Sequence, residues 1–217
     1  MQKTSISDAF EETFISKIKV DQGNQHVSKY IQMRQDINQS VEFTTTFKNQ
    51  VHKGVVKGIE LAVKILTAGL WKFPQNEACV LPADLNACVI VMTDYYKQQH
   101  VGKNLTCAAH LGDCEVLSKI YSKPYSFTLT TYQTAILMQF NEKDCYTFQE
   151  LLDLTKLPKE AMIVQIYNLI SPKYGKLLIK ENIKSPKIEQ TEKIKLNTAY
   201  NSSSLRANLM PIAQHKV

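Results

Sequence analysis

Residues 105–140 read LTCAAHLGDCEVLSKIYSKPYSFTLTTYQTAILMQF, and the spacing of the apolar side chains changes within this stretch. Apolar residues first recur at every second position, which is typical of a strand, and then at intervals of three and four, which is typical of a helix. Before the change we predict short strands at 105–111, 114–120 and 126–130, and after it a helix at 132–140 with Thr130 or Thr131 as its N-cap. The sequence therefore predicts a small β-sheet that leads into a helix.

The residues after this stretch predict two more helices and a two-stranded hairpin. Residues 147–150 (TFQE) have the composition of a capping box, and Pro158 is suited to the first turn of a helix that ends at Ser171-Pro172. Alternating apolar residues then predict two strands, which carry Leu177, Ile179, Ile194 and Leu196 and are joined by a polar segment around Ser185-Pro186. Three helices with a two-stranded wing indicate a winged helix.

The residues before the stretch predict mostly helices. Apolar stripes occur at 5–19, at 27–36, and in a third piece capped by Ser40. None of the three has a partner for its stripe, so together they indicate the remainder of a helical bundle. A short helix at 59–67 ending at Gly69 and a longer one starting at Pro82 are also predicted, with Trp71 in a core. The predicted fold class is α+β, with a bundle remnant, a small antiparallel β-sheet and a winged helix.

Composition is that of an ordinary globular chain, with 44% apolar and 21% charged residues and a net charge of +6. We find no signal peptide and no membrane-spanning run, which predicts a cytoplasmic or nuclear location. The five cysteines are an odd set without a C-x-x-C pair, so neither a disulfide framework nor a metal site is indicated. Seven lysines against three glutamates in residues 173–195 predict a basic wing. It could contact an acidic partner or nucleic acid, but a solvated hairpin is the simpler interpretation.

Several short motifs, in order, resemble the cullin family. Residues 102–106 (GKNLT), 111–114 (LGDC) and 132–141 (YQTAILMQFN) are similar to G-R-K-L-T-W, L-G-x-C and Q-x-x-x-L-x-x-F-N of that family. Upstream, 17–23 (KIKVDQG) and 66–71 (LTAGLW) are similar to K-L-K-x-E-C-G and L-T-x-G-x-W. Cys107 stands where the family motif has tryptophan, which removes a large apolar surface.

Cullins are scaffold subunits of multisubunit RING ubiquitin ligases, and the resemblance implies three of their regions. These are the end of the helical bundle at 1–66, the α/β domain at 67–130 and the first winged helix at 131–217. In the family, a RING-box protein adds a strand to the sheet of the α/β domain, and its RING recruits a ubiquitin-charged conjugating enzyme. The expected RING-box contacts are the apolar residues of the predicted sheet: Leu105, Cys107, Ala109, Leu111, Val116, Phe127 and Leu129. No catalytic residue and no cofactor is implied.

Two family features have no counterpart in this sequence. These are the N-terminal cullin repeats that carry substrate adaptors and the second winged helix with its modified lysine. We therefore expect a fragment, a misassembled gene model or a shortened paralogue. A complete chain of this kind would compete with longer cullins for the RING subunit.

Two other kinds of function were weighed. A winged helix can bind DNA through its third helix, but residues 159–170 hold one lysine and no arginine, with Gln165 and Asn168 as the other base readers. This composition argues against nucleic acid as a partner. An enzyme could use Cys107, His110 and Asp113, but residues three apart on a strand point to opposite faces, so burial of the thiol and imidazole is the simpler interpretation.

Overall fold

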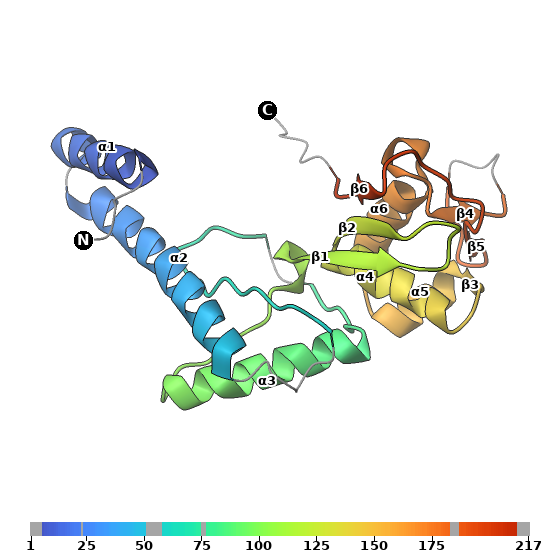
Figure 1. Cartoon of the computed structure of the whole chain (residues 1–217), viewed down its shortest axis with the longest axis horizontal. Helices are drawn as coiled ribbons and strands as arrows, with labels where there is room; N and C mark the ends of the chain where they lie inside the picture. Colours follow the sequence, from blue (N-terminus) through green and yellow to red (C-terminus); the bar gives the residue numbers. More distant parts are fainter. Residues whose placement is uncertain (1–5, 23, 51–57, 75–76, 183–186, 212–217) are drawn as a thin grey trace. The chain divides into compact units, whose positions relative to one another are not determined.

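The computed structural model describes residues 6–22, 24–50, 58–74, 77–182 and 187–211 (Figure 1). Its contacts divide the chain into two compact units, each with its own core. One unit comprises Met1–Pro74 with Ile90–Lys103, and the other comprises Gln75–Val89 with Asn104–Val217. These bounds differ from the domains 1–66, 67–130 and 131–217 that the sequence suggested, and those domains stay a prediction.

The first unit is helical. It contains α1 (Ile6–Gln22), α2 (Asn24–Gln50) and the C-terminal part of α3 (Ala83–Gln99). The separate helices predicted at 27–36 and after Ser40 are wrong, because α2 is continuous through both. Ser40 lies inside α2, where its hydroxyl donates to Asp36 O at 2.6 Å, so it does not cap a helix. Phe47 is buried against Tyr95 of α3, with ring centroids 5.5 Å apart.

The helix predicted at 59–67 is also wrong, since these residues have no regular secondary structure. They are fixed by one stripe of polar side chains on α2, where Thr44 Oγ1, Ser40 Oγ and Asp36 Oδ2 accept hydrogen bonds from the amides of Val63, Ile65 and Thr67 at 3.1, 2.7 and 2.8 Å. The acceptors recur every four residues, as one face of a helix requires, and the donors every two, as extended backbone requires. The side chains of α2 therefore accept the backbone hydrogen bonds that a neighbouring strand would otherwise accept from this extended segment.

Asp36 is the centre of this arrangement. Besides the Thr67 amide, its carboxylate accepts the Thr67 hydroxyl at 2.9 Å and the Trp71 indole N–H at 2.8 Å. Burial raises the pKa of Asp36, but the hydrogen bonds from Thr67 and Trp71 outweigh it and hold the pKa below its ordinary value. Trp71 is half-buried, and Gly69 has a φ of +80° in a turn, not at a helix end.

Replacing Asp36 with alanine should lower the free energy of unfolding of this unit by roughly 3 kcal/mol, since three donors lose a charged acceptor and each unpaired buried group costs about 1–3 kcal/mol. Urea denaturation followed by tryptophan fluorescence measures the change, because Trp71 is the only tryptophan. Asp94→Ala on the exposed face of α3 is the matched control, with an expected change within about 0.5 kcal/mol. Equal effects of the two substitutions would contradict a structural role for Asp36.

The second unit contains a three-stranded sheet that leads into a helix. Its strands are β1 (Asp113–Ser118), β2 (Tyr125–Thr130) and β6 (Arg206–Asn208), in the order β1-β2-β6. β1 is antiparallel to β2, as predicted, whereas β6 is parallel to it, so the sheet is mixed (Figure 1). The helix α4 (Thr131–Leu137) follows β2 directly, with Thr130 as its N-cap.

The strand predicted at 105–111 is wrong. Residues 105–108 have no regular secondary structure, and Ala109–Leu111 forms a 3₁₀ helix, η1. The amides of Leu111 and Gly112 donate to Ala108 O and Ala109 O, which curls the chain just before β1. A Cβ at Gly112 would collide with the Thr131 hydroxyl, so only glycine fits where the chain enters the sheet.

The elements between α4 and β6 are two α-helices, two 3₁₀ helices and the three strands of a second sheet. After η2 (Met138–Asn141) come β3 (Cys145–Thr147), α5 (Phe148–Thr155), α6 (Lys159–Ile170), η3 (Pro172–Tyr174), β4 (Leu178–Lys180) and β5 (Lys193–Leu196). The strands pair antiparallel in the order β3-β5-β4. The predicted capping box at Thr147 and the end of α6 at Ser171 are confirmed. The segment around Ser185-Pro186 lies outside the described residues.

The inward face of β4 differs from the prediction. Leu178 pairs with Leu196, and Lys180 pairs with Ile194. The side chains of Leu178 and Lys180 therefore lie on the same face of the sheet as that of Ile194, and all three residues are buried. Ile179 is therefore only half-buried, although Leu177 before the strand is buried as expected. A three-residue strand is too short for its alternation to define its face.

One hydrophobic core connects the two sheets with α4, α5 and α6. It includes Tyr125, Phe127 and Leu129 of β2, Ile136 of α4, Phe148 and Leu151 of α5, Met162, Ile166 and Leu169 of α6, and Ile194 of β5. The α+β fold class is thereby confirmed. In the part of the chain described here, no helix has the length and apolar character needed to cross a membrane.

The cap of α5 makes stability depend on pH. Glu150 accepts hydrogen bonds from Lys143 Nζ at 2.8 Å and from the Thr147 amide at 2.6 Å. The hydrogen bond from Lys143, followed by those from the Thr147 amide and hydroxyl, lowers the pKa of Glu150 from 4.5 to about 2. A lowered pKa in the folded chain adds stability that is fully present above the ordinary pKa and is lost as the pH falls through the folded value.

We expect Glu150→Gln, which keeps the capping shape and removes the charge, to lower Tm by a constant amount above about pH 5 and by progressively less toward pH 2. Thermal unfolding followed by circular dichroism between pH 7 and pH 2 measures this gap. Glu142→Gln at an exposed position is the control. A gap that stays the same at every pH would contradict the assigned pairing.

Candidate functional site

The candidate site is the outer edge of β1. Figure 1 shows β2 between β1 and β6, so β2 is paired on both sides. β1 is paired with β2 on one side only, and no other strand in the described ranges pairs with it. An edge strand presents unpaired N–H and C=O groups on which another chain can form a further strand.

The register shows which β1 residues carry those groups. Ser126 N donates to Leu205 O, and Leu209 N donates to Thr128 O, so Ser126 and Thr128 direct their backbone groups toward β6. The direction of the backbone N–H and C=O groups alternates along a strand, so the β2 residues on either side of Ser126 and Thr128 direct these groups toward β1. These are Tyr125, Phe127 and Leu129, and their partners are Ser118, Val116 and Cys114.

It follows that Asp113, Glu115 and Leu117 direct their backbone groups away from β2. They form the pairing edge that a partner strand would meet. The side chains of Cys114, Val116 and Ser118 are half-buried on the core side, whereas those of Asp113, Glu115 and Leu117 are exposed. The edge is therefore both open in its backbone and accessible in its side chains.

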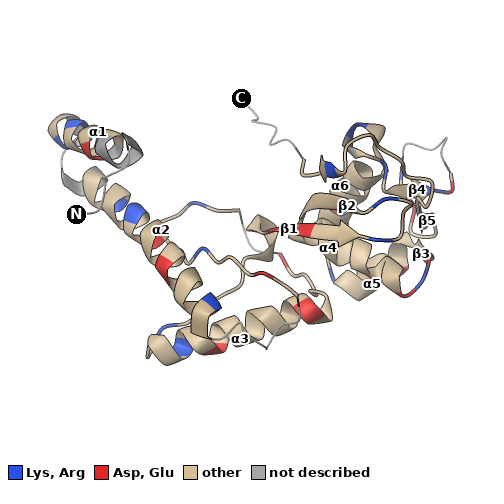
Figure 2. Ribbon diagram, viewed as in Figure 1, with Lys and Arg blue, Asp and Glu red and all other residues tan. Residues whose placement is uncertain are grey.

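Exposed apolar side chains flank this edge at both ends. Leu111 is 42% exposed before β1, Leu117 is 61% exposed near its end, and Ile120 is 60% exposed just after it. Asp113 and Glu115 place two charges on the edge, a usual protection against pairing, but three exposed apolar residues close to one another favour a contact surface. Glu115 accepts a hydrogen bond from the Ser126 hydroxyl, and Figure 2 shows acidic residues on β1, so a partner strand with basic residues would complement this edge.

The site residues predicted from the sequence fall into three groups. Val116 lies on β1 and packs against the core, and Leu111 lies exposed beside the edge. Leu105, Cys107 and Ala109 lie in the irregular segment and η1, which precede the edge. Phe127 and Leu129 are 2% and 0% exposed in the central strand. The structure therefore places these last two in the core and not at the surface that a partner would contact.

Leu117 and Ile120, two exposed apolar residues beside the edge, were not among the site residues predicted from the sequence. Leu117 has the opposite parity to Cys114, Val116 and Ser118, the residues predicted to face the core. The sequence did contain a signal for Leu117, because it is an apolar residue on the outer face of the predicted strand. Ile120 was placed on the inner face of a longer strand, but β1 ends at Ser118.

The alternative of a DNA interface on α6 loses one of its base readers. Gln165 is 9% exposed and is the acceptor for the Thr130 hydroxyl at 3.3 Å, so it is engaged in the core. The exposed side of α6 instead carries Val164 and Tyr167. Specific reading of bases needs extended polar or basic side chains on the recognition helix, and the one basic side chain of α6 is Lys159, its first residue.

The alternative of thiol catalysis is opposed by the ionisation of the cysteines. Partial burial raises the pKa of Cys107, although Cys107 is an exposed residue. Burial, followed by the nearby Cys107, raises the pKa of Cys79 to about 11, and burial raises that of Cys88. A nucleophilic cysteine requires a lowered pKa.

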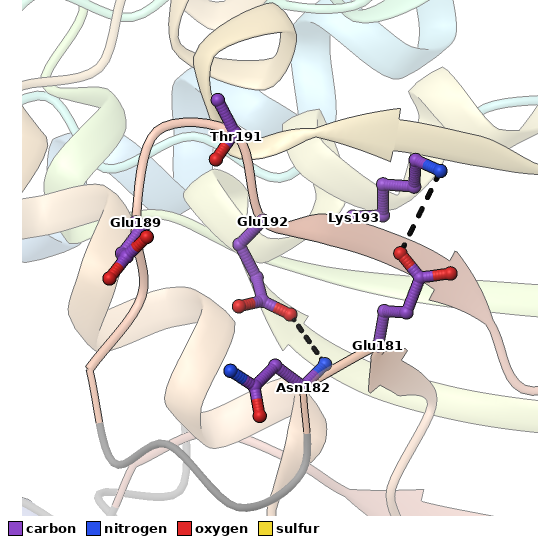
Figure 3. Close-up of a pocket in the computed structure, with 6 residues that line it drawn as sticks. All are labelled: Glu181, Asn182, Glu189, Thr191, Glu192 and Lys193. Atoms are coloured by element: carbon purple, nitrogen blue, oxygen red, sulfur yellow. Dashed lines mark hydrogen bonds and ion pairs between the residues drawn. The ribbon is translucent and has the colours of Figure 1, made fainter.

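A hollow at the base of the wing is lined by charged residues (Figure 3). Glu181 pairs with Lys193 at 3.7 Å and with Lys195 at 3.8 Å, and Glu192 accepts the Asn182 amide at 2.8 Å. The carboxylates of Glu181 and Glu192 are therefore engaged by partners within the hairpin. The pairs also neutralise part of its basic charge. Among the described residues, no group of three or more His, Cys, Asp or Glu is arranged to hold a metal ion.

The fold and the site together define an α+β protein with an open strand edge, and comparison with known proteins identifies its family. The family model for the cullin alpha+beta domain matches residues 65–200. The chain is 31% identical to Cullin-3 of Dictyostelium discoideum and 30% identical to Cullin-1 of Oryza sativa subsp. japonica, each over 179 residues. These matches cover 82% of this chain and 23% and 24% of the two relatives.

A longer match, at 27% identity over 213 residues, is to Cullin-1 of Caenorhabditis elegans, with 96% of this chain and 27% of the relative covered. The chain therefore belongs to the cullin family. It spans about a quarter of the length of the curated relatives that it matches.

Proposed function

We propose that this chain is part of the scaffold of a cullin-RING ubiquitin ligase and that it docks a RING-box protein at the outer edge of β1. The observation that carries the proposal is the outward direction of the backbone groups of Asp113, Glu115 and Leu117, on a strand that pairs only with β2 in the described part of the chain. A strand from the RING-box protein would pair with these groups. The backbone hydrogen bonds would supply affinity, and the alternating side chains would set the register.

The proposed role is noncatalytic. The RING-box protein would bring a ubiquitin-conjugating enzyme, and the assembly would serve ubiquitin-dependent protein degradation. The raised pKa values of Cys79, Cys88 and Cys107 support a scaffold over an enzyme that carries ubiquitin on its own thiol. A cytoplasmic and nuclear location is part of the proposal, on the sequence grounds given above.

Coexpression with a RING-box protein tests the proposal. We expect the two chains to copurify as a one-to-one complex, measured by size-exclusion chromatography with light scattering. A chain that is folded by circular dichroism but retains no RING-box protein would refute the docking role. Hydrogen exchange of the complex should show the greatest added protection at the amides of Glu115 and Leu117, because these point outward.

A further inference from the structure

The outward-facing residues at the end of β1 follow a charge pattern that reverses with direction. Glu115 and Leu117 are exposed and alternate with half-buried residues of the strand. Lys119, directly after β1, is exposed and has the same parity. In chain order the pattern is acidic, apolar and basic, so a second copy that runs in the opposite direction presents basic, apolar and acidic side chains. Two copies of this segment are therefore complementary when they lie antiparallel.

The registers of two antiparallel β1 strands differ in the side chains that face each other. Residues whose backbone groups point outward must lie opposite one another, because only these can exchange hydrogen bonds between the copies. A register centred on Glu115, or on a β1 residue before it, places two carboxylates directly opposite, which is destabilising. A register centred on Val116 places Asp113 opposite Lys119. It also leaves each Glu115 carboxylate opposite an apolar Leu117 side chain.

A register centred on Leu117 gives a favourable contact at every facing pair. Leu117 lies opposite Leu117 of the second copy, and on either side of this centre Glu115 of one copy lies opposite Lys119 of the other. Apolar pairs and pairs of opposite charge both stabilise facing strands. The chain bends at Ile120, so the paired segment would end at Lys119. Registers centred beyond Leu117 are disfavoured because they shorten this segment.

The present contacts of these side chains are compatible with this register. Leu117 is 61% exposed, so an apolar neighbour would remove a large apolar surface from water. The Ser126 hydroxyl donates to Oε1 of Glu115 from the neighbouring strand β2. This contact holds the Glu115 side chain on the exposed face of the sheet, and its second carboxylate oxygen can accept a lysine ammonium.

We propose that two copies of this chain form a symmetric dimer in which β1 pairs antiparallel with β1 of the second copy, centred on Leu117. The two three-stranded sheets would join at their β1 edges, with β6 outermost in each copy (Figure 1). The paired segment, residues 115–119, is short, so we expect a weak dimer with Kd in the micromolar range. The dimer does not depend on the proposed function, because it needs only this chain. A RING-box strand would use the same backbone groups, so the two would exclude each other.

Charge reversal tests the facing pairs. Sedimentation velocity of the wild-type chain should show a monomer–dimer equilibrium that depends on concentration. Glu115→Lys and Lys119→Glu should each weaken the dimer by about tenfold or more, because like charges then face each other. An equimolar mixture of these two variants should form a heterodimer with Kd within about threefold of wild type, since each acid again faces a base. Glu142→Lys makes the same change of charge at an exposed position outside the sheet and should change Kd less than about twofold.

Cross-linking tests the centre of the register. Cys107→Ser removes one exposed thiol, and in this background Leu117→Cys should form a disulfide-linked dimer under mild oxidation about tenfold or more faster than Glu115→Cys. Facing residues of a hydrogen-bonded pair have Cα atoms about 5.5 Å apart, which suits a disulfide. Leu117→Pro removes the outward amide at the centre and should give a monomer. Circular dichroism checks that each variant is folded.

Three results would each overturn the dimer. These are a wild-type chain that stays monomeric at every concentration, a mixture of the two charge variants that stays monomeric, and Glu115→Cys that cross-links as fast as Leu117→Cys. A folded Leu117→Pro chain that dimerises like wild type would also exclude pairing at this edge. These measurements contain no RING-box protein, so failure of the dimer leaves the docking role standing, and failure of docking leaves the dimer standing.

Discussion

Leu117→Pro should weaken RING-box binding roughly 100-fold and leave the chain folded. The Leu117 amide points away from β2, so proline removes a donor only from the open edge, and its ring obstructs an approaching strand. The lost hydrogen bond and the partner carbonyl left unpaired together amount to about 3 kcal/mol, which corresponds to about two powers of ten in Kd. Isothermal titration calorimetry measures the affinity, and circular dichroism checks the fold.

Two neighbouring substitutions separate backbone from side-chain effects. Leu117→Thr keeps the outward amide and removes the apolar side chain, so the expected loss is about tenfold or less. Val116→Pro removes an amide that faces Phe127 across the β1–β2 pair, so it should destabilise the sheet itself. A folded Leu117→Pro chain that binds as tightly as wild type would exclude strand addition at this edge.

Local signals predicted the parts of the fold that depend on few neighbouring residues. An N-cap at Thr130 or Thr131 and a capping box at Thr147 were predicted from residues at most three positions apart, and the structure has capping boxes at Thr130 and Thr147. The alternation in β2 correctly placed Phe127 and Leu129 on one face of the strand, and the structure shows this face to be buried. In each case the interacting groups lie within one turn or one strand.

Strand partners could not be predicted in the same way. Alternation at 105–111 indicates which side chains share a face, but it does not show that a neighbouring strand exists, and here none pairs with it among the described residues. β6 spans three residues with no pattern of their own and pairs with β2 from far along the chain. Position in a sheet is set by contacts distant in sequence.

The burial of two of the predicted site residues has the same cause. Phe127 and Leu129 were chosen as partner contacts because they are apolar strand residues, but β6 makes β2 a central strand. For residues 59–67 the sequence did carry the correct signal, since Ile59, Leu61, Val63 and Ile65 alternate as extended backbone requires. The hydrogen-bond acceptors that replace a strand partner lie on α2, and the sequence of 59–67 alone does not show them.

Phe127→Ala should lower the free energy of unfolding by about 3–5 kcal/mol, the usual effect of truncating a buried aromatic residue. Phe127 is 2% exposed, and its ring lies 5.4 Å from that of Tyr200 and 6.0 Å from that of Tyr125, measured between centroids. Alanine would leave a cavity among rings that are fixed by the sheet. Urea denaturation measures the loss, and Thr128→Ala, on the opposite face of β2, should cost less than about 1 kcal/mol.

Phe127 also distinguishes a core residue from a binding residue. Phe127→Leu keeps the site apolar and should cost less than about 1.5 kcal/mol, so the chain remains folded at 25 °C. If Phe127 serves only the core, this variant binds the RING-box protein with the wild-type Kd. A folded Phe127→Leu chain with binding weakened tenfold or more would instead mean that the partner contacts this ring, as the sequence pattern predicted. The strand would then have to enter the sheet beside β2, which requires β6 or β1 to leave it.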